Sequence, residues 1–128
     1  MILRILHTIL LGILLCIGVA QVPQSFNYQA VVRDASGNVQ ANKPITLRFT
    51  LTDGNGGTII YREVHSVSTN EFGLVNAIIG KGAPVGSPFS TDLLIQGATT
   101  GLDKVFVQTE IDLQAGSNFV TMGSAPLQ

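Results

Sequence analysis

The feature that most constrains the fold is a strict alternation of apolar and polar side chains that begins after Pro44. The apolar positions are Ile45, Leu47, Phe49 and Leu51, and the polar ones are Thr46, Arg48, Thr50 and Thr52. Successive side chains of a β-strand point to opposite faces of the sheet. The pattern therefore predicts a strand with one face in the core and the other in water.

The same two-residue period recurs along the chain, with turn-forming residues between the segments. It is found in residues 26–33, 58–69, 74–79, 104–113 and 119–122. After residue 20 no segment keeps a 3.6-residue period, so helices are not expected. Residues 83–103, rich in Gly and Pro, are predicted to form a long loop in which only residues 93–95 suggest a short strand. Short strands separated by turns predict an all-β, antiparallel β-sandwich, with a small barrel as the alternative.

The N-terminal segment, residues 1–20, has the pattern of a signal peptide. Arg4 supplies the positive charge, and residues 9–20 are an uninterrupted apolar run. A membrane-spanning helix needs roughly 20 apolar residues, more than this run provides, so cleavage after Ala20 is the favoured interpretation. Retention of the segment as a membrane anchor stays open as the alternative. Cys16 raises the alternative of a lipoprotein, but Leu15 before it is bulkier than the small residue expected there.

Residues 21–128 are then expected to form one cysteine-free domain that depends on its core alone. This part of the chain has six basic and eight acidic residues, so its formal charge is −2. The basic residues are dispersed and not interleaved with aromatic ones, which excludes the pattern typical of nucleic-acid binding.

Two groups of residues are candidates for catalysis, and a structural role is the favoured interpretation of both. Glu110 and Asp112 share one face of a predicted strand, which suits an acid–base pair or a metal site but also a solvated strand face. His65 beside Ser66, with Asp53 or Glu63 as the acid, would be a Ser-His-acid triad. The G-x-S-x-G nucleophile motif is absent from the sequence, so we expect a half-buried strand histidine instead.

Two glycine-rich segments suggest ligand loops but lack the complete motifs. Residues 53–57 (DGNGG) begin like a calcium loop, yet position 64, where the bidentate acid should lie, is Val64. Residues 80–82 (GKG) lack the spacing of a phosphate-binding loop. We interpret the first as a hairpin turn and the second as a strand-end turn.

Several short segments together resemble a domain found at the N-terminus of secreted and surface proteins of Bacteroidetes-type bacteria. They are residues 26–38 (FNYQAVVRDASGN), 60–65 (IYREVH), 69–74 (TNEFGL), 107–112 (VQTEID) and 118–123 (NFVTMG). The layout is also similar to carboxypeptidase-regulatory or transthyretin-like sandwiches. The resemblance implies an exported, Ig-like module without catalytic residues, often followed by a stalk, a fibre-like region or a self-cleaving chaperone. Relatives continue through a strand ending near V-P-Y-A, so a missing last strand stays open as an alternative.

Together these observations predict a non-enzymatic structural or adhesion-type module that is secreted or attached to the cell surface, with the periplasm as another location. A soluble carbohydrate- or peptide-binding protein that uses residues 83–103 is the alternative, and a secreted hydrolase is a third. Other surface proteins or extracellular glycans are the expected partners, and the membrane is contacted only through the signal segment. No catalytic, cofactor-binding or metal-binding residue is predicted.

Overall fold

The computed structural model of the protein describes residues 24–127, and the predicted signal peptide lies outside them. The strands are β1 (Phe26–Val31), β2 (Pro44–Asp53), β3 (Thr58–Ser68), β4 (Leu74–Ile79), β5 (Ala83–Pro84), β6 (Val105–Asp112) and β7 (Val120–Pro126). Helix α2 (Thr91–Gly97) and a 3-10 turn (Leu102–Lys104) lie between β5 and β6. Apart from the short strand suggested at residues 93–95, the predicted strands are therefore present, and most of their ends fall within two residues of the expected positions.

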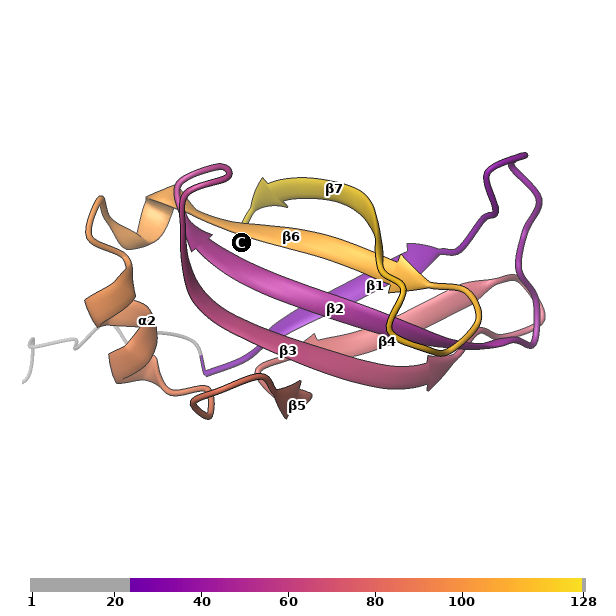
Figure 1. Ribbon diagram of the computed structural model, residues 1–128, viewed down its shortest axis with the longest axis horizontal. Helices are drawn as coiled ribbons and strands as arrows, with labels where there is room; N and C mark the ends of the chain where they lie inside the picture. Colours follow the sequence, from indigo (N-terminus) through magenta and orange to yellow (C-terminus); the bar gives the residue numbers. More distant parts are fainter. Residues whose placement is uncertain (1–23, 128) are drawn as a thin grey trace, which may run out of the picture.

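The strands form two antiparallel sheets that face each other. The larger sheet has five strands in the order β5-β3-β2-β6-β7, and the smaller has two, β1 and β4. In Figure 1 the smaller sheet lies behind the larger one and crosses it, while α2 lies at one end near the β2–β3 turn. The chain is thus an all-β protein with a sandwich-like arrangement, as the alternating pattern predicts.

The core lies between the two sheets and is centred on the apolar face of β2. Ile45, Leu47, Phe49 and Leu51 are each at most 1% exposed. From the smaller sheet, the ring of Tyr28 meets Phe49 edge-on with centroids 4.8 Å apart. Val75, Ala77 and Ile79 of β4 are buried as well. Burying an aliphatic or aromatic side chain of this size stabilises the fold by roughly 1.5–3 kcal/mol, so the four buried side chains of β2 contribute substantially to stability.

The second face of β2 is not in water, contrary to the prediction from its polar side chains. Thr46, Thr50 and Thr52 are at most 6% exposed. β2 is the central strand of the larger sheet, so long side chains on β3 and β6 cover it from both sides. For example, Arg62 of β3 donates from Nε to the Thr50 hydroxyl at 2.9 Å. The Thr50 hydroxyl thus has a partner within the sheet, and the Thr52 hydroxyl donates to the Gly54 carbonyl at 2.7 Å, so threonine is tolerated at these two buried positions.

Helix α2 corrects the expectation that no helix follows residue 20 and that residues 93–95 are extended. Ser90 caps its N-terminus by accepting a hydrogen bond from the Leu93 amide at 3.0 Å. Leu94 is buried, and Gly97 lies against Ile60 of β3, where a Cβ would come within 2.4 Å of the Ile60 Cγ2 atom. With seven residues the helix is too short to show a helical period. In residues 24–127 no helix has the length and apolar character needed to cross a membrane.

Candidate functional site

An ionisable cluster lies inside the sandwich, on the inner face of β3. Tyr61, Glu63 and His65 alternate along this strand and therefore point to the same side. The register with β2 places Glu63 opposite Phe49 and His65 opposite Leu47, in the middle of the apolar core. Glu63 has no exposed surface, and a buried carboxylate is costly unless its oxygens are paired.

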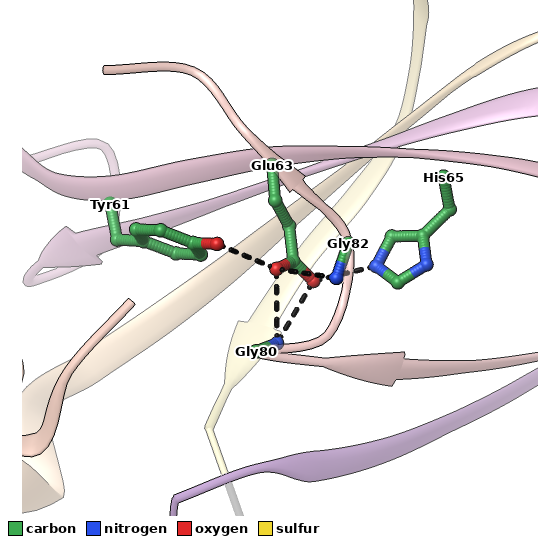
Figure 2. Close-up of polar contacts among 5 residues, drawn as sticks. All are labelled: Tyr61, Glu63, His65, Gly80 and Gly82. Carbon is green, nitrogen blue, oxygen red and sulfur yellow. Dashed lines mark hydrogen bonds and ion pairs between the residues drawn. The ribbon is translucent and has the colours of Figure 1, made fainter. Parts of the chain in front are cut away.

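Every partner of Glu63 is a hydrogen-bond donor from the protein itself, as Figure 2 shows. The Tyr61 hydroxyl donates to Oε2 at 2.8 Å, and Nε2 of His65 lies 2.6 Å from Oε1. The Gly80 amide lies 3.0 Å from each oxygen, and the Gly82 amide donates to Oε2 at 3.2 Å. Because an ionised carboxylate only accepts, His65 must place a proton on Nε2 in this arrangement.

The two glycines let the turn after β4 approach the carboxylate closely. Gly80 has φ +103°, a conformation that side chains disfavour, and a Cβ there would lie 2.9 Å from the Gln24 carbonyl oxygen. A Cβ on Gly82 would lie 2.5 Å from Nε2 of His65. The turn expected at residues 80–82 is confirmed. In this turn the backbone amides of Gly80 and Gly82 bind the Glu63 carboxylate. The sequence does not reveal this role, because Glu63 lies on a strand 17 residues before Gly80.

Opposing effects act on the pKa of Glu63. Burial raises the pKa, but hydrogen bonds from His65, Tyr61 and the Gly80 amide outweigh it and hold the pKa below its ordinary value. The same contact has the opposite effect on Tyr61, whose pKa is raised by burial and by the neighbouring Glu63. Glu63 is therefore ionised at neutral pH and Tyr61 is a neutral donor. The cluster ties β3 to the end of β4 and so joins the two sheets.

The contribution of Glu63 to stability is expected to depend on pH. Since its pKa is lower in the folded state, that contribution is fully present above the ordinary value of 4.5 and is lost as the pH falls through the folded-state value. The difference in unfolding free energy between wild type and Glu63→Gln should therefore shrink below about pH 4.5, as measured by urea denaturation over a pH series. A difference that stayed constant down to about pH 2.5 would contradict the lowered pKa.

One family model matches this chain over nearly all of the two sheets, from the second residue of β1 into β7. It is described as a domain of unknown function (DUF8740) and matches residues 27–124. The chain belongs to this family. Neither a curated protein nor a solved structure gives a significant match. The Glu63 cluster lies within the matched part of the DUF8740 domain.

The Ser-His-acid triad considered for His65 is not assembled in this DUF8740 domain. Ser66 follows His65 on the strand and pairs with Thr46, so it belongs to the opposite face of β3. Asp53 lies at the far end of β2, where its carboxylate accepts hydrogen bonds from the hydroxyls of Thr99 and Thr100. Of the two acids considered, only Glu63 contacts His65. The expected half-buried histidine is confirmed, and its acidic partner lies in the core.

Glu110 and Asp112 share a face of β6, as expected, but each serves a different contact of the DUF8740 domain. Glu110 forms a two-point ion pair with Arg48, with contacts of 2.6 and 2.9 Å, and the Arg48 guanidinium lies 4.2 Å from the centroid of the Phe119 ring. Asp112 accepts from the amides of Gln114, Gly116 and Asn118 and so holds the β6–β7 turn. Both side chains are buried, so the expectation that they lie on a solvated strand face is wrong. They therefore act as structural acceptors rather than as a pair.

The DGNGG segment forms the β2–β3 hairpin turn, as predicted. Asp53 joins this turn to the segment after α2 through Thr99 and Thr100, and these hydrogen bonds lower its pKa. Over residues 24–127 no three His, Cys, Asp or Glu residues lie close enough to hold a metal ion. Asp53, the first residue of the suspected calcium loop, therefore has a structural role as the acceptor for Thr99 and Thr100.

Proposed function

We propose that the DUF8740 domain of this chain is a non-enzymatic structural or adhesion-type module, exported to the cell surface or the extracellular space. The observation that carries the proposal is the position of Glu63 and His65. An acid and a histidine 2.6 Å apart would be natural candidates for acid–base chemistry. Glu63, however, has no exposed surface and accepts hydrogen bonds from four residues of the protein. These groups hold the two sheets together.

Export is the second part of the proposal and depends on residues 1–20. Their charge and apolar run match a signal peptide, and the segments that resemble surface proteins of Bacteroidetes-type bacteria favour the same location. A domain without disulfides can persist outside the cytoplasm if its core is well packed, and the inner face of β2 meets that need.

The proposal is tested in a Bacteroidetes-type host with the full chain carrying a C-terminal epitope tag. We expect the tag to be accessible to antibody on intact cells or present in the medium, with a mature N-terminus at Gln21 by mass spectrometry. A matched variant that lacks residues 2–20 should remain inside the cell. Wild-type protein found in the cytoplasm with residues 1–20 intact would contradict export. A hydrolytic activity of the purified protein that is lost in Glu63→Gln would contradict the non-enzymatic role.

A soluble carbohydrate-binding protein is the second candidate function, and one observation favours it. A hollow of about 270 Å³ lies where the turn after β4 meets the segment before α2, lined in part by Lys81, Phe89 and Ser90. Small-molecule sites combine aromatic or apolar side chains with a few polar groups, and this lining would suit a sugar. A glycan array separates the candidates, because specific binding that disappears in Lys81→Ala would favour this function over the structural one.

A further inference from the structure

The two sheets differ in width, which leaves part of the larger one uncovered. Neighbouring strands lie about 4.8 Å apart, so a two-stranded sheet covers only part of a five-stranded one. β1 lies over β2, where Tyr28 meets Phe49, and the turn that ends β4 lies against β3, where Gly80 meets Glu63. Figure 1 shows β7 at the edge of the larger sheet, beyond β6. The inner face of β6 and β7 therefore extends past the smaller sheet.

This uncovered face is a groove of about 320 Å³ beside β1. Tyr28 forms one wall, Val107 and Thr109 of β6 form the floor, and residues 122–125 of β7 form the other wall. None of these residues is charged. At the rim Met122 is 42% exposed, although it is a large apolar side chain. The groove is thus an uncharged extension of the core.

The strands on both sides of the groove have free edges. Within residues 24–127 no strand pairs with the second edge of β1 or of β7. Sheet edges are usually protected by charged side chains, proline or bulges. β7 has Pro126 and an irregular register with β6, but β1 (FNYQAV) has no charge and no proline, and its register with β4 is continuous. The edge of β1 is therefore suited to accept a further strand.

We propose that an extended, uncharged strand of another polypeptide pairs with the free edge of β1 and fills the groove. The strand on the other edge of β1 indicates the side chains required. In β4 the positions facing the core are Val75, Ala77 and Ile79, which alternate with the exposed Asn76 and Ile78. A strand of the same pattern would place its apolar side chains against Val107 and Met122. A charged strand would lose hydration there without gaining a partner.

This inference extends the proposed function, on which its biological setting rests, because strand addition would join a surface module to its neighbour. Binding itself is measurable with purified protein, whatever the location of the chain in the cell. A failure of strand binding would leave the export result unchanged, and the two proposals can therefore fail separately.

The test uses mature protein and a synthetic peptide with the sequence of residues 74–79 (LVNAII) followed by two lysines for solubility. Binding is followed by NMR chemical shifts and calorimetry. We expect saturable binding with the largest shifts at Tyr28, Val107 and Met122. A control peptide in which the positions of Val75 and Ala77 carry aspartate should bind at least about tenfold more weakly, which corresponds to about 1.4 kcal/mol.

Two lysine variants on β7 provide matched controls. Ala125→Lys places a charge in the groove, whereas Thr121→Lys places one on the opposite face, where Thr121 pairs with Glu110. Both positions are exposed, so both variants should fold. Ala125→Lys should weaken peptide binding at least about tenfold and Thr121→Lys less than about twofold.

Four results would overturn the proposal. They are the absence of binding at millimolar peptide, an equal loss of binding in both lysine variants, self-association that Ala125→Lys abolishes, and NMR contacts from residues 21–23 to Val107 in the free protein. The third would assign the groove to a second copy of this chain, and the fourth to the chain's own N-terminal segment.

Discussion

Replacing Glu63 by alanine is expected to lower the free energy of unfolding by about 3–5 kcal/mol, because each buried donor left without an acceptor costs about 1–3 kcal/mol. The substitution leaves four donors without an acceptor in the core: the Tyr61 hydroxyl, Nε2 of His65 and the amides of Gly80 and Gly82. It also removes the contact between β3 and the turn after β4. Urea denaturation followed by circular dichroism measures the effect.

Two further variants identify the cause of this loss. Glu71 is exposed, so Glu71→Ala should change the unfolding free energy by less than about 0.5 kcal/mol. Glu63→Gln keeps the shape and one acceptor oxygen, but its NH₂ group faces amide donors, so an intermediate loss is expected. If Glu63→Ala cost less than about 1 kcal/mol, the cluster would not hold the two sheets together.

Replacing Phe49 by alanine should cost about 3–5 kcal/mol, because the cavity left at the centre of the core cannot close fully. Phe49 is fully buried, and its ring contacts Tyr28 of β1 at 4.8 Å and His65 of β3 at 5.4 Å between centroids. Loss of this ring removes the contact with Tyr28 between the two sheets and the contact with His65 that supports the Glu63 cluster. Thermal and urea denaturation provide the measurement.

The matched control is the same substitution at the surface. Phe72 lies in the turn before β4 and is 70% exposed, so Phe72→Ala should change the unfolding free energy by less than about 0.5 kcal/mol. Equal losses in Phe49→Ala and Phe72→Ala would mean that the side-chain period does not separate core from surface in this chain.

The local sequence pattern was sufficient to predict the structure of segments that depend only on their own residues, such as a single strand or turn. The alternation after Pro44 correctly identified β2 and its core face, and the turn expected between residue 33 and the strand after Pro44 is present at residues 34–38. There the Asp34 carboxylate accepts from the amides of Ser36 and Asn38, each at 2.9 Å. Helix α2 was missed because seven residues are too few for a period, although Ser90 and Asp92 mark its start.

The sequence pattern could not predict the burial of side chains that are covered by neighbouring strands. The polar face of β2 was expected in water, yet Thr50 is fully buried because β3 and β6 flank it. Glu110 lies on the face opposite the core, but it is buried rather than in water, because it forms an ion pair with Arg48, 62 positions away. Only the pairing of β2 with β6 brings these two side chains together.

The sequence by itself determined that this chain forms strands, where most of them begin and end, and which side chains of β2 enter the core, because these properties follow from the two-residue period of a single strand. Only the tertiary structure decided that Glu63 enters the core beside His65 and the amides of Gly80 and Gly82, and that β6 and β7 leave an open groove. Those outcomes depend on sheet order and on the unequal width of the two sheets, which join residues distant in the chain.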